Sequence, residues 1–300
     1  MEKILIIKLG ASGDVVRTTT LLHILNGEIH WLTGDMNAML LQGIPKIKKI
    51  ITPSELAETS FGEYDLVINL EDDVESSMLL SGIKTKEIFG AYLGKDQKVH
   101  YTESSKEWFD LSLISTHGIK KANQLKFENK KSYQEMIFSG LGYTFAGESY
   151  LLPESPKTDL RGDIAVAPKA GKVWPMKNWA YFNLLVKHLR SEGLSVNILP
   201  ERPTMLEHLA DVRNHEVLIS GDSLPMHFAL GSEIPLVTLF ICTSAAEIYD
   251  YNLMTKIVSP DLQKYWYRRD FDEKATKSIP FDEVLYSVSK ILERRLVHAH

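Results

Sequence analysis

The chain has 300 residues, 44% of them hydrophobic and 24% charged, which is typical of a globular protein large enough for two α/β domains. With 34 basic and 39 acidic residues the net charge is −5, which excludes a bulk electrostatic attraction to nucleic acid. A single cysteine, Cys242, excludes an internal disulfide framework or a thiolate metal cluster, and no stretch approaches the roughly 18 apolar residues of a membrane helix.

The first predicted elements are a buried parallel strand over residues 4–7 and an amphipathic helix over residues 15–25. The turn between them contains Gly10, Gly13 and Asp14 and lies at the carboxyl edge of the predicted sheet, where open α/β sheets bind ligands. It has neither the Gly-Lys-Ser/Thr ending of a P-loop nor the glycine spacing of a dinucleotide fingerprint. The short apolar run indicates a core strand and not a secretion signal.

The carboxylate of Asp14 gives this turn its chemical character. Negative charge at a helix N-terminus is favourable in itself, but it would repel a phosphate placed at the same point. The turn therefore indicates a base beside a substrate, not a phosphate cradle. The alternative is that Asp14 only caps its helix, and position alone leaves both interpretations open.

Further strands are predicted over residues 29–32, 47–51 and 65–69, and their alternation with helices indicates a parallel sheet. The acidic run Glu71-Asp72-Asp73 is interpreted as a solvated helix start in preference to a metal site. Over residues 90–150 the alternation fades into an insertion rich in aromatic and basic residues, with helical patterns at 108–116 and 132–139. Such an insertion suits an acceptor surface, although a plain surface subdomain is the alternative.

A linker rich in proline and charge covers residues 153–163, and a second strand-helix series follows it. We expect domains at 1–156 and 157–280, then a final helical segment at 281–300. Strands are predicted at 164–167, 195–199, 216–220 and 236–240, and helices at 178–191, 204–213, 224–231 and 281–296.

The second half carries a strand-to-helix turn of its own, with Gly221, Asp222, Ser223 and, one turn into the helix, His227. The free N–H groups at such a helix start attract a diphosphate, and the serine and histidine add donors. The alternative is a capped helix with a satisfied histidine. The loop over residues 168–179 adds lysines near a glycine, which suit phosphate, although a solvated basic loop is possible.

Together these stretches resemble the heptosyltransferase family, glycosyltransferase family 9, whose members use ADP-heptose in lipopolysaccharide core assembly. The run from Lys8 to Thr19 resembles the opening motif of the family, Lys172-Val173-Trp174-Pro175 its Lys-x-Trp-Pro loop, and the run from Gly221 to His227 its Asp-Ser/Thr-Gly-x-x-His motif. The three motifs occur in the family's order and spacing along nearly the whole chain.

The resemblance implies a GT-B architecture, in which two Rossmann-like domains with parallel sheets bind acceptor on the N-terminal side and nucleotide-sugar on the C-terminal side. It implies that Asp14 is the general base and that Lys172 contacts the diphosphate, with no metal and no cofactor. The expected donor-binding residues are Lys169, Glu201, Gly221, Asp222, Ser223, His227 and Thr243, and the expected acceptor-side residues are Ser12, Gly13, Arg17 and Thr18. The final helix is expected to cross back onto the first domain.

The sequence also departs from the family pattern. Leu224 and Ile241 stand where glycines are usual, and Ala167-Pro168 replaces hydroxyl residues that some members have. Glu201 is the nearest counterpart of a donor-site glutamate. The two glycine replacements are expected to narrow or reshape the diphosphate pocket.

The expected function is an inverting, metal-independent glycosyltransferase that moves heptose from ADP-heptose to a hydroxyl of a cell-surface glycan, a glycolipid or a related glycoconjugate. The expected partners are this donor and acceptor and no nucleic acid, with a cytoplasmic location and peripheral association with the inner membrane. One alternative is an NAD-dependent oxidoreductase, because Asp35 lies about 20 residues after the glycine turn, where a ribose-binding acid would stand. A catalytically silent nucleotide-sugar-binding protein is the other.

Overall fold

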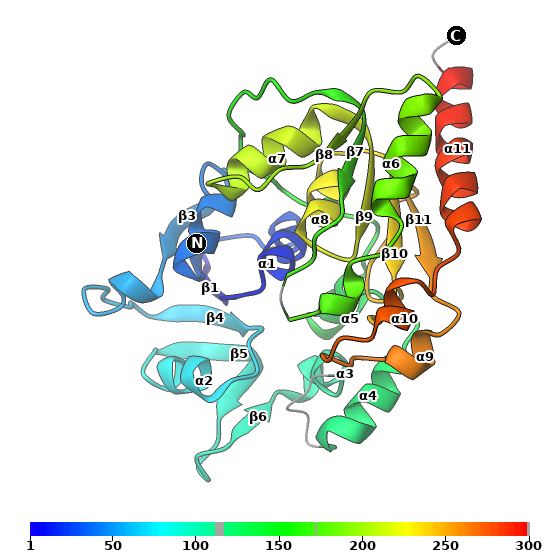
Figure 1. The fold of residues 1–300 in the computed structure, drawn as a ribbon. Coiled ribbons are helices and arrows are strands. Elements are labelled where there is room, and N and C mark those ends of the chain that lie inside the picture. The colour runs from blue at the N-terminus through cyan, green and yellow to red at the C-terminus, as the bar shows by residue number, and fades with distance from the viewer. Residues whose placement is uncertain (112–116, 172, 299–300) are drawn as a thin grey trace. The chain divides into compact units, whose positions relative to one another are not determined.

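The computed structural model describes residues 1–111, 117–171 and 173–298, and the side chains of the last helix as far as residue 294 (Figure 1). The described chain forms two compact units. The first consists of Met1–Pro153 and Ala246–Tyr249, and the second of Glu154–Ala245 and Asp250–His300. The division after Pro153 falls at the start of the predicted linker. A short segment of the second half, residues 246–249, belongs to the first unit.

The first unit is built on a sheet with the strand order β3-β2-β1-β4-β5-β6, in which β6 alone runs antiparallel among the described strands. Both faces of this sheet are buried. Ile4 and Ile6 pack in one apolar cluster while Leu5 and Ile7 pack in another, which explains why the strand is a continuous apolar run. The strands are β1 (Lys3–Ile7), β2 (Glu28–Leu32), β3 (Ile47–Ile51), β4 (Tyr64–Asn69), β5 (Thr85–Leu93) and β6 (Val99–Tyr101).

The predicted helix at 15–25 is divided in the structure. The α-helix α1 spans Ser12–Thr18, and the 3-10 helix η1 continues over Thr19–His23. The reason lies in three consecutive threonines, whose hydroxyls donate to backbone carbonyls three or four residues earlier. Such bonds compete with the regular helical pattern and tighten the turn.

The insertion at 90–150 contributes to the core of the first unit, so it is more than a surface subdomain. Tyr133, Ile137 and Phe138 of α5 are buried in the same cluster as Ile4 and Ile6. The predicted helix at 132–139 is confirmed as α5 and begins with a capping box formed by Ser132 and Glu135. The α-helices that follow α1 among the described residues of the first unit are α2 (Val74–Ser81), α3 (Lys106–Phe109), α4 (Gly118–Glu128) and α5 (Tyr133–Gly140). Residues 112–116 of the predicted 108–116 helix lie outside the described residues.

The second unit has a parallel sheet with the strand order β11-β10-β9-β7-β8. All four strands predicted for this half are confirmed, and β11 was not predicted. The strands are β7 (Gly162–Ala167), β8 (Val196–Ile198), β9 (His215–Gly221), β10 (Leu236–Phe240) and β11 (Met254–Val258).

Helices cover the sheet of the second unit on both faces in Figure 1. The predicted helix at 178–191 begins later, at Phe182, because the residues before it make tertiary contacts: Asn178 accepts from the Ala170 backbone N–H, and Trp179 donates to the Ile279 carbonyl. The helices are α6 (Phe182–Ser191), α7 (Met205–Arg213), α8 (Leu224–Gly231), α9 (Leu262–Tyr265), α10 (Glu273–Thr276) and α11 (Phe281–His298).

The final helix α11 packs on its own half of the chain. Val284, Val288 and Ile291 are buried in the core of the second unit, together with residues of β7, β9 and β10. We expected this helix to cross to the first domain, but it groups with the second unit. The segment of the second half that groups with the first unit is 246–249. The apolar face of α11 is therefore satisfied within the second unit.

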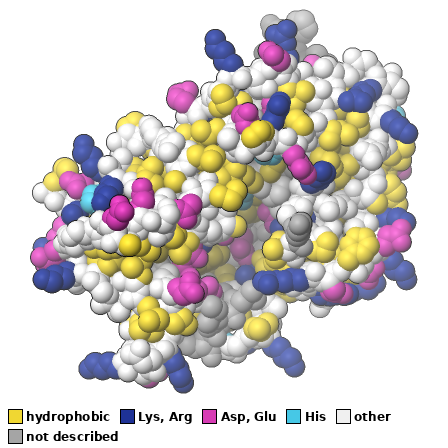
Figure 2. All heavy atoms as spheres, turned by 60° about the vertical axis from the view of Figure 1, so that its left-hand side comes forward, with side chains coloured by type: hydrophobic (Ala, Val, Ile, Leu, Met, Phe, Trp, Pro, Cys, Tyr) yellow, Lys and Arg dark blue, Asp and Glu magenta, His cyan; other side chains and the backbone are white. Residues whose placement is uncertain are grey.

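The surface carries both signs of charge. Figure 2 shows acidic and basic side chains interspersed over one face of the molecule. Among the described helices, none is both long enough and apolar enough to span a bilayer.

Candidate functional site

Asp14 lies in the first turn of α1, directly after β1 and its glycine-containing turn. The N-cap position belongs to Ala11, so Asp14 is not the N-cap residue that the alternative interpretation required. Its carboxylate is about one-third exposed and forms an ion pair with Arg17, whose Nη2 lies 2.9 Å from Asp14 Oδ1. An added Cβ at Gly10 would meet no atom within 4 Å, so there is open space at this point of the turn. The turn therefore presents a carboxylate at the carboxyl edge of the sheet.

The other residues predicted on the acceptor side lie at different depths. Ser12 is half-buried and donates to Asn37 Oδ1 at 2.7 Å, while Gly13 is half-buried in the first turn of α1. Arg17 and Thr18 are buried beneath the turn. The Thr18 hydroxyl donates to the Asp14 carbonyl and contacts the hydroxyl of Tyr133 at 2.8 Å. Arg17 and Thr18 therefore support the turn from inside the first unit.

Glu71 holds the same turn in place, and sequence reasoning missed this role. Its Oε1 accepts from Lys8 Nζ at 2.9 Å and from the backbone N–H groups of Leu9 and Gly10 at 2.6 and 3.1 Å. We had interpreted the run 71–73 as a solvated helix start, which is confirmed for Asp73, the N-cap of α2. The available signal was that Glu71 follows β4, whose carboxyl end lies beside that of β1.

The carboxylate of Asp35 is engaged by Ser54. It begins the 3-10 helix Asp35–Leu40 after β2, and its carboxylate accepts from the Ser54 hydroxyl and, at 3.4 Å, from the Ser54 backbone N–H. The Ser54 hydroxyl lowers the pKa of this exposed carboxyl. These contacts satisfy the Asp35 carboxylate within the protein, without a bound ribose.

In the second unit, Asp222 follows β9 and is held by two side chains. Lys177 Nζ donates to its Oδ2 at 2.7 Å and to its carbonyl at 2.9 Å, and the Thr243 hydroxyl donates to Oδ2 at 2.7 Å. Burial raises the pKa of Asp222, but the charge and hydrogen bond of Lys177 and the bond from Thr243 lower it by more, so the net pKa lies below the ordinary value. Thr243 follows β10, and because β10 pairs with β9 its hydroxyl reaches Asp222.

Lys177 was not among the predicted site residues although it lies in the predicted lysine loop. It closes the 3-10 helix Pro175–Lys177, is buried, and lies 5.6 Å from the centre of the Trp174 ring. A Cβ added to Gly221 would come within 3.1 Å of the Lys177 carbonyl, so this loop approaches the end of β9 closely. Lys172, the lysine that we expected to contact a diphosphate, lies outside the described residues.

The start of α8 is close to the form predicted. Ser223 is the N-cap residue, Pro225 lies in the first turn, and the Ser223 hydroxyl is directed to the Gly221 carbonyl at 3.4 Å and not to a helix N–H. His227 is buried, and its charge is among the influences that lower the pKa of Asp222. The structure therefore brings Asp222, Thr243 and His227 into one electrostatic group.

Lys169 and Glu201 pair with each other. Their side chains form an ion pair at 2.8 Å, and both are more than three-quarters exposed. The Lys169 ammonium lowers the pKa of Glu201. An exposed pair of this kind is easily broken, so both side chains remain available to a ligand at little energetic cost.

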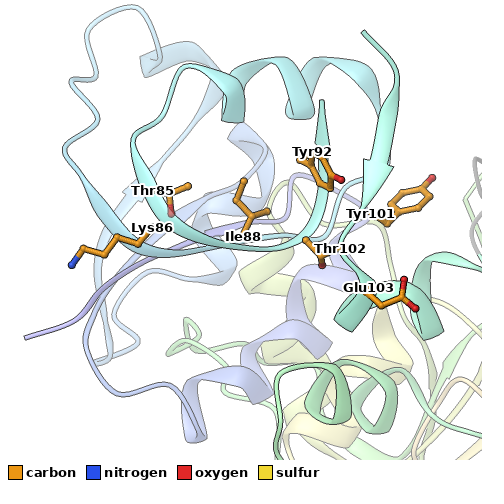
Figure 3. Close-up of a pocket in the computed structure, with 7 residues that line it drawn as sticks. All are labelled: Thr85, Lys86, Ile88, Tyr92, Tyr101, Thr102 and Glu103. Carbon is orange, nitrogen blue, oxygen red and sulfur yellow. The ribbon is translucent and has the colours of Figure 1, made fainter. Parts of the chain in front are cut away.

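A surface hollow of about 590 Å³ lies along β5 and the end of β6 (Figure 3). Its lining combines aromatic, apolar, hydroxyl and charged groups, which suits a polar ligand with an apolar face, such as a sugar. Both lining tyrosines, Tyr92 and Tyr101, belong to the insertion in which we expected an acceptor surface. The lining residues are Thr85, Lys86, Ile88, Tyr92, Tyr101, Thr102 and Glu103.

Comparison with known proteins yields matches in structure only. No protein-family model and no curated protein sequence matches the chain. A glycosyl transferase family 9 structure from Veillonella parvula aligns over 98% of both chains with a TM-score of 0.70 and 16% identity. The Escherichia coli heptosyltransferase WaaC with ADP-2-deoxy-2-fluoro heptose aligns over 98% of this chain and 99% of its own, with a TM-score of 0.56 and 12% identity. The fold is that of glycosyltransferase family 9.

A third structure of this fold is the iron-containing dodecameric glycosyltransferase TibC from enterotoxigenic E. coli, with a TM-score of 0.57 and 12% identity over 98% of this chain and 77% of its own. The predicted α/β class and the resemblance to the family are thus confirmed at the level of the fold. Within the described part of the present chain, no group of three or more His, Cys, Asp and Glu side chains is arranged to hold a metal ion.

Two departures from the motifs of glycosyltransferase family 9 have clear positions in this fold. Ile241 is fully buried in the core of the second unit, so its side chain packs against other apolar groups. Leu224 is half-buried and is the first residue of α8. Of the two, only Leu224 lies at the helix start at which we expected a diphosphate.

Proposed function

We propose that the protein is an inverting glycosyltransferase that moves heptose from ADP-heptose to a hydroxyl of a cell-surface glycan or related glycoconjugate, without a metal or cofactor. The observation that carries the proposal is the glycosyltransferase family 9 fold over 98% of both chains, with Asp14 and Asp222 at the expected turns. Two similar structures, of WaaC and TibC, are complexes of those proteins with ADP-linked heptoses. The resemblance further supports a cytoplasmic site of action at the inner membrane.

In the first unit, Asp14 acts as the general base. It takes the proton of the acceptor hydroxyl while the oxygen attacks the anomeric carbon from the side opposite the diphosphate, and the bond from that carbon to the diphosphate oxygen breaks. A single displacement of this kind inverts the configuration. The partly exposed carboxylate at an open turn supports this role, and the hollow of Figure 3 supports acceptor contacts in the same unit.

In the second unit, the leaving nucleoside diphosphate gains negative charge as the bond breaks. The N-terminal N–H groups of α8 and the side chains of Lys172 and His227 would stabilise that charge, more in the transition state than in the ground state. The ion pair with Lys177 supports this role, because it compensates the negative charge of Asp222 at the helix start. Without compensation, that carboxylate would repel a diphosphate.

The two alternatives receive less support. An oxidoreductase would need the first turn and Asp35 for its dinucleotide, yet Asp14 stands in this turn and Asp35 is bonded to Ser54. A silent binding protein is favoured by Leu224 alone, since Ile241 is packed in the core. Measuring ADP release with and without acceptors separates these functions.

Asp14→Asn should abolish transfer while ADP-heptose affinity stays within about a few-fold, because the amide keeps the shape of the carboxylate but accepts no proton. The assay is ADP release from purified full-length protein, with EDTA and without it, over a panel of glycan acceptors. Asp35→Asn is the matched control and should leave transfer unchanged. Near-normal turnover of Asp14→Asn would remove the base from the mechanism, and loss of transfer in EDTA with recovery on adding a divalent cation would remove its metal independence.

ADP binding should depend on the second unit. His227→Ala should weaken ADP binding by about 1–3 kcal/mol, the usual effect of deleting a hydrogen bond to a charged group, whereas Asp35→Ala should leave it unchanged. Isothermal titration calorimetry of each full-length variant with ADP measures both affinities. The opposite pattern, with ADP lost in Asp35→Ala and kept in His227→Ala, would favour the oxidoreductase.

A further inference from the structure

Arg17 carries its charge into the interior of the first unit. Its side chain is only 6% exposed, and its Nη2 lies 2.9 Å from Asp14 Oδ1. Its guanidinium carbon lies 4.1 Å from the centre of the Tyr133 ring and 5.4 Å from that of the Trp108 ring. Removing an ion from water costs several kcal/mol unless close partners compensate for it. Asp14 and the faces of the two rings provide this compensation.

The rings around Arg17 are themselves fixed. Trp108 meets Tyr133 edge to face with the ring centres 4.8 Å apart. The Tyr133 hydroxyl contacts the Thr18 hydroxyl at 2.8 Å, and the Tyr133 backbone N–H donates to the Glu247 carbonyl at 3.0 Å. Glu247 belongs to residues 246–249, the segment of the second half that groups with the first unit. The guanidinium therefore has little freedom to turn away from Asp14.

The charges that face this group favour the ionised pair. Burial lowers the pKa of Arg17, but Asp14, Tyr133, Glu247 and Tyr150 raise it by more, so it stays a cation. Burial raises the pKa of Tyr133, which keeps the phenol neutral at physiological pH. Asp14 and Glu71 add to that shift, while Arg17 and the Thr18 hydroxyl oppose it. Arg17 is thus the cation around which these neutral and negative groups are arranged.

We propose that Arg17 is the positioning residue for Asp14, keeping its carboxylate ionised and in a single orientation at the glycine turn. The inference rests on the proposed function in taking Asp14 as the base, and it adds the residue that orients this base and keeps it ionised to lower pH. Segment 246–249 holds Arg17 indirectly, because the Glu247 carbonyl bonds the backbone of Tyr133, whose ring faces the guanidinium. An opposite charge at this distance typically lowers the pKa of a carboxyl by about 1–3 units.

The direct test is the titration of the Asp14 carboxyl by ¹³C NMR in full-length protein labelled at aspartate, with the Asp14 signal assigned by its absence in Asp14→Asn. In Arg17→Met the midpoint should rise by about 1–2 units, and in Arg17→Lys by less. The acid limb of the pH profile of kcat/KM should move upward by the same amount. At neutral pH kcat should fall while the KM for ADP-heptose stays within about twofold, because Arg17 acts through the base alone.

Lys86→Met is the matched control. Lys86 forms an exposed ion pair with Asp65 at 2.6 Å in the same unit. Its removal should shift the titration midpoint of Asp65 and leave that of Asp14 unchanged. An unchanged Asp14 midpoint in Arg17→Met overturns the proposal. Should Arg17→Met fail to fold, Arg17→Gln supplies the test because it also removes the charge, and an Asp14 midpoint equal to wild type in that variant overturns the proposal.

The NMR titration also separates the two proposals. If Asp14→Asn retains turnover, Asp14 is not the base and the proposed function fails in that respect. The midpoint in Arg17→Met still reports whether Arg17 controls the ionisation of Asp14. A shifted midpoint without a shifted pH profile would support the electrostatic link and overturn the catalytic part of the inference.

Discussion

Lys177 brings a positive charge into the second unit, and its effect on stability follows from its burial. Lys177→Met removes the counter-ion of Asp222, whose carboxylate is nearly buried. The loss should lower the free energy of unfolding by about 3–5 kcal/mol at pH 7. Because the pKa of Asp222 is depressed in the folded protein, its stabilisation is present above the ordinary carboxyl pKa and is lost as pH falls through the folded value. The difference in the free energy of unfolding between wild type and Lys177→Met, measured by urea unfolding, should therefore be smaller at pH 3 than at pH 7.

Lys277→Met serves as the control for this prediction, since Lys277 pairs with Glu273 at the exposed surface. Only a small change in the free energy of unfolding is expected for such a solvent-screened pair. Equal effects of Lys177→Met and Lys277→Met would contradict the view that burial makes the first pair important.

At the scale of single residues, the sequence located the turns better than the partners. Asp14 and Asp222 could be placed because a strand, a turn and a helix follow one another along the chain. Their partners were predicted less well, since Arg17 was expected on the acceptor side but not as the partner of Asp14, and Lys177 was not expected at all. Both partners are recognised by burial, which depends on rings and strands distant in sequence. Lysines of one loop look alike in a sequence, and only packing separates a buried Lys177 from an exposed Lys169.

At the scale of elements, the turn after β1 depends on a carboxylate from the end of β4. Glu71→Ala would leave the nearly buried ammonium of Lys8 unpaired and would free two backbone N–H groups. We expect the free energy of unfolding to fall by about 3 kcal/mol, measured by chemical denaturation. Glu71→Gln, which keeps an acceptor oxygen, should cost less. Glu58→Ala, at an exposed position, should change little, and a similar loss there would contradict the assignment.

Strands were predicted well where both faces of the sheet are buried, because each strand is then a continuous apolar run. The strand β5 was missed because it begins with the polar residues Thr85, Lys86 and Glu87. The end of α1 at Thr18 depends on hydroxyl bonds that no apolar periodicity reveals. The order of the strands, and hence the nearness of Glu71 to Gly10, emerges only when the sheet is assembled.

At the scale of the whole molecule, three histidines make stability depend on pH. Burial lowers the pKa of His30, His208 and His215, so each favours its neutral form in the folded protein. The unfolded chain then binds more protons, so stability is full above about pH 6.5 and declines as pH falls below it.

Urea unfolding at pH 7.5, 6.5 and 5.5 checks this expectation. The free energy of unfolding should decrease from the first value to the last, and the decrease should be smaller in His208→Gln, which cannot take up that proton. Stability that is constant or rising toward pH 5.5 would contradict it.

The assignment of residues 246–249 to the first unit has a mechanical consequence. Within the described residues the chain passes between the units after Pro153, after Ala245 and after Tyr249. A protease cut in the first of these connections would leave the halves joined noncovalently, because Tyr133 still holds the Glu247 backbone. The nicked protein would elute from gel filtration as one species, and its two fragments would separate only in denaturant.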